Sequence, residues 1–165
     1  MTDTVTLWQN AATMAAQAHE GQTSPGSMIP YFAHPSRVAM IVATEFGCTD
    51  PEIIATAYLH DVFEKTSLTR EAVALTMGSH VVEWVEWLSK TNKDEKETYW
   101  QRLSESPWQA RLVKMADALD HLNGPAEYRD ARLRTARKAL ALATSDEPAI
   151  RRAAQVLQTA IEGRA

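Results

Sequence analysis

Apolar residues recur along this chain at spacings of three and four, which is the period of a helix that buries one face. The clearest apolar stripes are Leu7, Ala11, Met14, Ala15 and Ala18; then Val81, Trp84, Val85 and Leu88; and then Trp108, Leu112, Met115, Leu119 and Leu122. No alternation of apolar and polar residues reaches the length of a convincing strand. The pattern therefore predicts an all-α fold.

Prolines, glycines and short polar residues mark the expected helix ends. Helices are expected over residues 4–20, from Pro35 to the turn at Gly47, from Pro51, over 69–77, from Ser79, around Tyr99, from Pro107, over 127–144 and over 147–162, with the first capped near Asp3 or Thr4. Asp50 is placed to cap the helix that Pro51 opens, and Gly78 to end a helix in a left-handed conformation. Residues 92–97 are expected to form a charged connection.

Composition indicates one ordinary globular domain spanning residues 1–165, of which 45% are apolar and 23% charged. The net charge of −4 argues against a nucleic-acid polymer as partner, whereas a local pocket for a small anion remains compatible with it. Cys48 is the only cysteine, which excludes an internal disulfide and argues against a thiolate metal site. Without a secretory signal or a long apolar run, we expect a cytoplasmic protein with no membrane contact.

The stretch from Tyr58 to Thr66 carries the most chemical information. It places His60 and Asp61 side by side in an otherwise apolar helical run, with Glu64 one turn beyond His60. Burying charge is costly unless a partner compensates it, and a bound cation is the simplest partner. A polar corner at the end of a helix, facing solvent, is the alternative interpretation.

Two residues elsewhere favour the metal over the polar corner. His34 sits at a predicted helix start, fixed by the proline that follows, and Asp117 lies on a later helix with Lys114 and His121 on the same face. The set then offers two nitrogen and two oxygen donors, which suit Mn²⁺, Fe²⁺, Zn²⁺ or Mg²⁺ better than copper. The candidate metal ligands are His34, His60, Asp61 and Asp117.

The order of these residues resembles that of the HD-domain phosphohydrolase superfamily. Four segments are similar to motifs of the hydrolase domain of RelA/SpoT homologues, and in particular to small alarmone hydrolases: AHEGQ at 18–22, PYFAHP at 30–35, LHDVFE at 59–64 and KMADAL at 114–119. The resemblance covers roughly residues 5–160. It implies a single-domain helical HD-domain fold.

The resemblance also implies an activity, the removal of the 3′-pyrophosphate from guanosine tetra- or pentaphosphate, usually with Mn²⁺. It makes His34, His60, Asp61 and Asp117 the metal ligands. Glu64 falls where the family has an acidic residue that helps to activate water. Lys114 can meet a phosphate, and Gln22 and Tyr31 are further candidates for the substrate pocket.

The chain departs from the family pattern on the expected substrate side. Lys65 replaces a second acidic residue and joins Glu64 as a candidate catalytic residue; Thr23 and Ser24 stand where basic residues are common, and His121 where Asn is common. The partner is therefore expected to be a small phosphorylated nucleotide whose base stays open, with adenosine analogues included. A different HD-type nucleotide phosphatase or phosphodiesterase, or a module that binds nucleotide without cleaving it, remain alternatives.

Other polar residues have plainer interpretations. His19 is expected to be a structural residue at a helix end, and His80 a surface residue. The arginines at positions 129, 132, 134 and 137 can meet an anionic ligand, although a solvated face is the simpler interpretation. Exposed tryptophans would indicate an interface, so a homodimer is possible.

Overall fold

The predicted all-α fold is confirmed in the part of the chain that the computed structural model describes, residues 4–91 and 96–165. Its helices are α1 (Thr4–Ala18), α2 (Ala33–Met40), α3 (Pro51–Leu59), α4 (Val62–Lys65), α5 (Arg70–Met77), α6 (Ser79–Leu88), α7 (Lys96–Ser104), α8 (Trp108–Leu122), α9 (Arg129–Leu140) and α10 (Pro148–Glu162), with a π-helical turn η1 (Ile41–Glu45) and a 3₁₀ turn η2 (Ala126–Tyr128). In these ranges the only β-type pairing is an isolated bridge between Thr23 and Pro30. The expected cap Asp3 and most of the expected connection at 92–97 lie outside the described residues.

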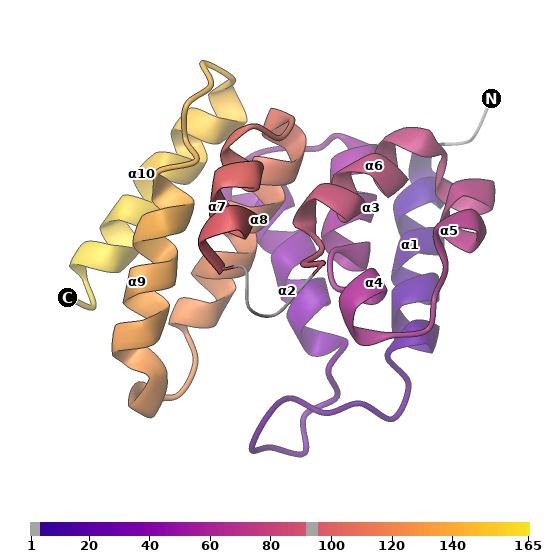
Figure 1. Ribbon diagram of the computed structural model, residues 1–165, viewed down its shortest axis with the longest axis horizontal. Helices are drawn as coiled ribbons and strands as arrows, with labels where there is room; N and C mark the ends of the chain where they lie inside the picture. Colours follow the sequence, from indigo (N-terminus) through magenta and orange to yellow (C-terminus); the bar gives the residue numbers. More distant parts are fainter. Residues whose placement is uncertain (1–3, 92–95) are drawn as a thin grey trace.

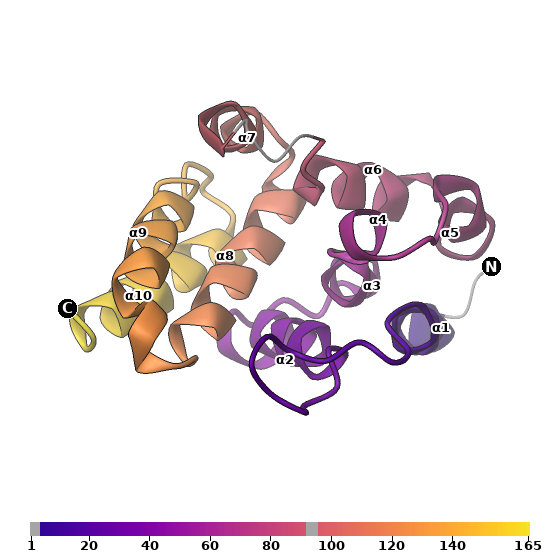
Figure 2. The same cartoon turned by 60° about the horizontal axis from the view of Figure 1, so that its bottom comes forward.

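Helix α8 runs through the middle of the molecule (Figures 1 and 2). It packs against α9 and α10 on one side and against α2, α3 and α6 on the other, while α1 lies along α3 at the far end. No helix in the described ranges is long and apolar enough to cross a bilayer. The cytoplasmic location and the homodimer stay predictions.

The predicted apolar stripes form one continuous core. Buried side chains from the stripes include Leu7, Ala11, Ala15, Val81, Val85, Leu88, Leu112, Met115 and Leu122. Met14, Ala18 and Trp108 pack at the edge of the core and are only partly buried. Helix α8 is buried on nearly all sides between the other helices, so its Asp117 and Asp120 lie in the interior.

The structure confirms the predicted cap at Asp50 and only part of the conformation predicted for Gly78. Asp50 caps α3 as predicted, because its side chain accepts hydrogen bonds from the backbone nitrogens of Glu52 (2.8 Å) and Ile53 (3.3 Å). Gly78 has the positive φ expected of a cap, at 85°, but its ψ of 175° is extended rather than left-handed helical. The reason is that Gly78 must leave α5 and enter α6 within one residue.

The helix predicted to run through His60 and Asp61 is interrupted there. His60 is the residue that ends α3, and Asp61, at φ −104° and ψ −4°, precedes the short helix α4. The apolar pattern continues across the break, so helical periodicity did not reveal it. The interruption places both side chains in the molecular interior, where each is more than nine-tenths buried.

Three other boundaries also shift. Helix α1 ends at Ala18 and α9 covers only Arg129–Leu140. Helix α2 begins at Ala33, two residues before the predicted Pro35, because the Ala33 nitrogen donates to the carbonyl of Pro30 at 3.0 Å. His34 therefore lies within the first turn of α2, and its side chain is fixed by the helix.

Candidate metal centre and its flanking pockets

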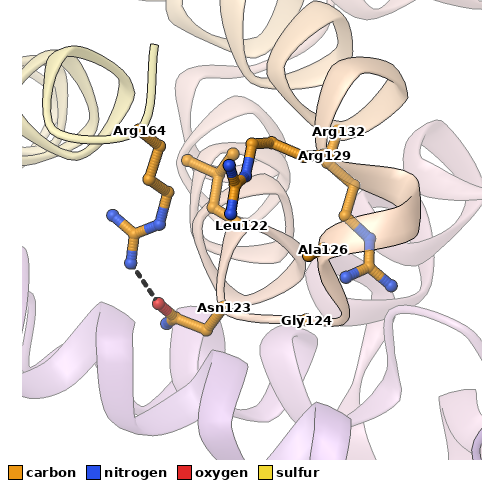
Figure 3. A pocket seen from close by; sticks show the side chains of 7 residues that line it. All are labelled: Leu122, Asn123, Gly124, Ala126, Arg129, Arg132 and Arg164. Carbon is orange, nitrogen blue, oxygen red and sulfur yellow. Dashed lines mark hydrogen bonds between the residues drawn. The ribbon is translucent and has the colours of Figure 1, made fainter.

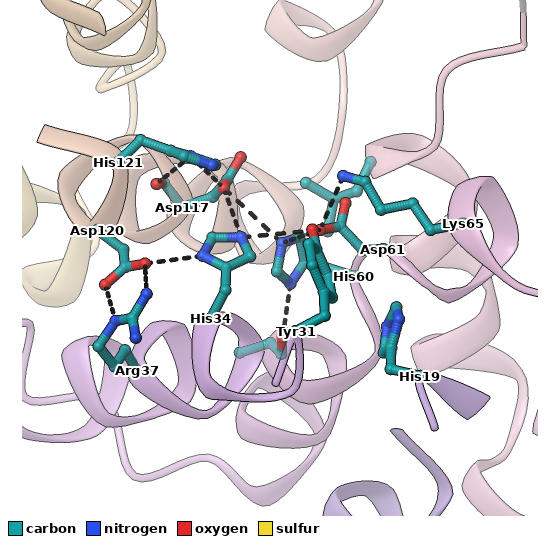
Figure 4. Close-up of polar contacts among 12 residues, drawn as sticks. His19, Tyr31, His34, Arg37, His60, Asp61, Lys65, Asp117, Asp120 and His121 are labelled. Atoms are coloured by element: carbon teal, nitrogen blue, oxygen red, sulfur yellow. Dashed lines mark hydrogen bonds and ion pairs between the residues drawn. The ribbon is translucent and has the colours of Figure 1, made fainter. Parts of the chain in front are cut away.

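The four predicted metal ligands converge at the middle of the molecule, from α2, the α3–α4 break and α8 (Figure 4). His34 Nε2 lies 3.2 Å from Asp117 Oδ1 and 3.7 Å from Asp61 Oδ2. His60 Nε2 lies 3.3 Å from Asp61 Oδ2 and 3.8 Å from Asp117 Oδ1. One ligand atom each from His34, His60 and Asp117 lie within 4.8 Å of one another, and Asp61 is not part of that tighter group.

The unpaired atoms of this cluster fit a divalent metal. All four side chains are buried, and within the described part of the chain His34 Nε2 and His60 Nε2 have no hydrogen-bond partner. Buried polar atoms are nearly always paired, so two unpaired imidazole nitrogens beside two carboxylates need an explanation. Imidazole nitrogens and carboxylate oxygens together are a donor set for a divalent cation.

Both histidines are oriented by a hydrogen bond behind the ring. His60 Nδ1 lies 2.7 Å from the carbonyl oxygen of Ala57, and His34 Nδ1 lies 2.8 Å from Asp120 Oδ2. The ring N–H donates in each case, which leaves Nε2 with the lone pair that a metal needs. Asp120 is held in turn by Arg37, through Nε to Oδ1 at 2.6 Å and Nη2 to Oδ2 at 3.0 Å.

Asp120 and Arg37 were not predicted as part of the site. Asp120 is buried, which by itself would raise its carboxyl pKa, but the bonds to His34 and Arg37 hold that pKa below its usual value. A weak signal did exist, since Asp120 follows Asp117 by one helical turn and Arg37 follows His34 by one. The sequence did not indicate that the helical turn of His34 and Arg37 faces the helical turn of Asp117 and Asp120.

Asp61 is kept charged by its neighbours. Burial alone would raise its pKa, but His60 and Lys65 outweigh burial and hold it well below the usual range. Lys65 Nζ lies 3.2 Å from Asp61 Oδ2 and also sits over the ring of Tyr31, 5.3 Å from the centroid. The Tyr31 hydroxyl donates to the same oxygen of Asp61.

Asp117 is held between two cationic side chains. Lys114 Nζ lies 2.7 Å from Oδ2 and His121 Nδ1 lies 2.9 Å from Oδ1. Burial would raise the Asp117 pKa, yet Lys114 and His121 hold it well below its usual range. Burial alone would lower the pKa of Lys114. The charges of Asp117 and Tyr99 outweigh burial and raise that pKa, so the Lys114 ammonium stays protonated.

Two of the remaining predicted substrate residues, Gln22 and Thr23, lie at the start of the α1–α2 loop and do not line the pockets beside the cluster. Gln22 bridges two elements: His19 Nδ1 donates to its Oε1, and its Nε2 donates to the carbonyl of Lys65, both at 2.8 Å. His19 is buried and bonded to Gln22 through Nδ1, whereas its Nε2 is buried without a hydrogen-bond partner in the described ranges, so its structural role stays a prediction. Thr23 lies at the bridge to Pro30 in the loop between α1 and α2. Their roles in binding substrate stay predictions.

Two pockets of different character flank the metal ligands. The first, here called the lysine pocket, has a volume of about 240 Å³ and is lined by Glu64, Lys65, Lys90, Tyr99 and Lys114 beside the ligands. The second, the loop pocket, measures about 440 Å³ and has mainly apolar walls from the α1–α2 loop and the segment after α8. His121 borders both pockets. Lys90 is a member of the site that sequence reasoning missed.

The fold and the centre define a helical protein with a buried cluster of histidines and aspartates from three separate helical elements, and this cluster is compatible with a divalent metal. The family model described as HD domain matches residues 11–160, so the chain belongs to the HD domain family. The family resemblance seen in the sequence motifs is thereby confirmed. The individual metal ligands stay a prediction, which the geometry above supports.

Known relatives carry related names. Over 127 residues the chain is 34% identical to guanosine-3′,5′-bis(diphosphate) 3′-pyrophosphohydrolase MESH1 of Xenopus tropicalis. This alignment covers 74% of the present chain and 71% of MESH1. The chain is 34% identical over 149 residues to the bifunctional (p)ppGpp synthase/hydrolase SpoT of Escherichia coli strain K12, covering 84% of this chain but only 21% of SpoT. A solved structure of a metazoan SpoT orthologue that hydrolyses ppGpp has a TM-score of 0.77 at 24% identity, over 92% of this chain and 94% of that one.

Proposed function

We propose that this protein is a metal-dependent hydrolase that removes the 3′-pyrophosphate from guanosine tetra- or pentaphosphate. The supporting observation is that the candidate metal centre lies between a pocket rich in lysines and a larger, mainly apolar pocket. A nucleotide with a 3′-pyrophosphate has an anionic pyrophosphate, which suits the lysines, and a nucleoside, which suits the apolar pocket. The bond between these two parts is the one that must break. The MESH1 relative of Xenopus tropicalis is named for this reaction.

His34, His60, Asp61 and Asp117 would hold the metal, and we propose that it is Mn²⁺, because a mixed imidazole and carboxylate set suits that ion. When bound, a divalent metal lowers the pKa of water and draws charge from phosphoryl oxygens. The protein's own part is to keep both carboxylates ionised and both Nε2 atoms free.

The lysine pocket would bind the pyrophosphate. Lys114 is largely buried beside Tyr99 and Trp100, with its Nζ 5.5 Å from each ring centroid, and it lines the lysine pocket. Lys65 and Lys90 line the same pocket from its exposed side. Three ammonium groups can thus neutralise the charge on the pyrophosphoryl group as water attacks its phosphorus and the 3′ oxygen of the nucleotide leaves and takes up a proton.

Glu64 is placed to act as the general base. It is exposed, lines the lysine pocket and belongs to the same short helix as Lys65. A carboxylate there can take the proton from the water that attacks phosphorus. Lys65 stands where the family has a second acid, so in this chain a cation accompanies the base instead.

The base of the nucleotide would occupy the loop pocket. Its loop wall contributes Ser24 and Ser27, and the stretch from Gln22 to Pro30 contains no charged residue. A hydroxyl both donates and accepts hydrogen bonds, so it does not by itself choose between guanine and adenine. We therefore extend the proposal to the adenosine counterparts of the substrate.

Product analysis by ion-exchange chromatography tests this proposal. The protein is incubated with Mn²⁺ and ppGpp, pppGpp or their adenosine analogues, with a His60→Ala/Asp61→Ala double variant as the control and circular dichroism as a check of folding. Pyrophosphate and the 5′-phosphorylated nucleoside should form with wild type only. Orthophosphate alone would instead indicate a phosphatase, and intact nucleotides that nevertheless bind would indicate a binding module.

A further inference from the structure

A third pocket, here called the arginine pocket, lies where α8 ends and α9 begins (Figure 3). Its volume is about 260 Å³, and its polar side chains are Asn123, Arg129, Arg132 and Arg164. Asn123, Gly124 and Arg132 line the loop pocket as well. The two pockets therefore adjoin each other, and the arginine pocket lies beyond the loop pocket as seen from the metal ligands.

The positive charge in this pocket is not neutralised by the protein. Across residues 4–91 and 96–165 none of the three guanidinium groups forms an ion pair, and Nη1 of Arg132 is buried with no hydrogen-bond partner. Arg164 uses two of its donors on the carbonyl of Ala160, at 3.1 Å, and on the side-chain oxygen of Asn123. Three cations around one hollow, in a chain of net charge −4, create a local site for an anion.

Gly124 lets Arg132 take up its position. A Cβ atom on Gly124 would lie 1.6 Å from Nη1 of Arg132, so any side chain there would displace the guanidinium. The other arginines of α9 behave differently, because Arg134 and Arg137 are exposed and line none of the three pockets described above. The solvated-face interpretation of the sequence thus describes positions 134 and 137, and Arg129 and Arg132 instead border a hollow.

The position of the pocket suits the far end of a nucleotide. Asn123 follows Asp117 by six residues, which is about 9 Å along a helix at its usual rise per residue. The loop pocket connects the candidate metal centre with the arginine pocket. His34 and His121 line it beside the metal centre, and Asn123 and Arg132 line it beside the arginine pocket. A nucleotide whose 3′ group lies at the metal ligands would thus direct its 5′ group toward the arginines.

We propose that the arginine pocket binds the 5′-phosphate chain of the nucleotide, an inference that rests on the proposed function. Guanidinium groups form paired, charge-assisted hydrogen bonds to phosphate oxygens, and Arg129, Arg132 and Arg164 line one hollow without a carboxylate partner in the described ranges. The pocket would distinguish nucleotides by the presence of 5′ phosphates, independently of the 3′ group.

Binding of two ligands without a 3′-pyrophosphate tests the inference without turnover. Isothermal titration calorimetry measures the Kd of GDP and of guanosine for wild type, Arg129→Ala, Arg164→Ala and the matched control Arg134→Ala. Wild type and the control should bind GDP more tightly than guanosine by about tenfold, since charge-assisted bonds to phosphate add to affinity. Arg129→Ala and Arg164→Ala should lose this preference while their affinity for guanosine stays unchanged.

A second variant leaves every charge in place. Gly124→Ala should push the Arg132 guanidinium aside and reduce the preference for GDP in the same direction, with the fold checked by circular dichroism. Equal affinities of wild type for GDP and guanosine would overturn the inference, as would an equal loss in Arg134→Ala. Turnover of ppGpp is scored separately: turnover without a GDP preference rejects only the arginine pocket, and a GDP preference without turnover rejects only the proposed reaction.

Discussion

A histidine binds a metal through a nitrogen that carries a lone pair, and in this site one hydrogen bond behind each ring decides which nitrogen that is. For His60 the acceptor is the backbone carbonyl of Ala57, which no substitution removes. For His34 it is the carboxylate of Asp120, which comes from another helix. The orientation of His34 can therefore be tested directly.

Asp120→Ala should weaken Mn²⁺ binding by roughly ten- to a hundredfold, because the bond that fixes the His34 ring is lost. Electron paramagnetic resonance of free Mn²⁺ measures the Kd without any substrate. Asp120→Asn keeps an oxygen that can accept from Nδ1 and should recover part of the affinity. A Kd equal to that of wild type in Asp120→Ala would show that His34 is positioned by packing alone.

Glu64→Gln should lower kcat by about a hundredfold or more, which is the usual contribution of a general base. Its Mn²⁺ affinity should not change, because Glu64 is not among the converging ligands. Steady-state hydrolysis of ppGpp together with a Mn²⁺ titration separates the two effects. Glu71→Gln, an exposed glutamate on α5, serves as the control; a normal kcat in Glu64→Gln would assign the base elsewhere.

That His34, His60, Asp61 and Asp117 lie together could be predicted from the sequence, because residue type and order already restrict the candidate metal ligands. Asp120 and Lys90 could not, since their contribution depends on packing. The bond from His34 to Asp120 spans 86 positions and exists only because α2 lies against α8. Lys90 enters the lysine pocket from the end of α6, which no local pattern relates to Asp117.

At the scale of elements, the break between α3 and α4 matters most for the site. Composition predicts an unbroken helix, because Val62 and Phe63 continue the apolar pattern and neither Gly nor Pro interrupts it. The chain nevertheless leaves helical geometry at Asp61. Helix positions and faces were thus predictable from periodicity, whereas this interruption depends on contacts with α2 and α8 that lie far away in sequence.

Helix α3 presents His60 at its end, so its first turn contributes to the stability on which the site depends. Asp50→Ala removes the side-chain cap and should lower the free energy of unfolding by about 1 kcal/mol. Urea denaturation followed by circular dichroism measures the change. Asp146→Ala, at an exposed aspartate outside any helix, should have little effect; equal losses in both variants would show that the cap is dispensable.

At the scale of the whole molecule, the candidate metal centre ties together three helical elements that are distant in sequence. A cation that binds only the folded arrangement stabilises it by mass action, by about 2.7 kcal/mol at a hundred times its Kd. Chelation with EDTA should therefore lower the Tm seen by differential scanning calorimetry, and Mn²⁺ should restore it. In His60→Ala the Tm should no longer respond to either addition; an unchanged Tm in wild type would mean that the site holds no metal under those conditions.

The loop between α1 and α2 contributes no candidate metal ligand, unlike the helices around it. It walls the loop pocket with little regular structure beyond the Thr23–Pro30 bridge, and it is anchored at its ends through Gln22 and Tyr31. The metal ligands all lie outside it, on helices or at their ends. Mutations in this loop can therefore change which nucleobase is bound while the candidate metal ligands stay unchanged. Descendants of one ancestral enzyme can thus diverge in substrate without passing through an inactive form.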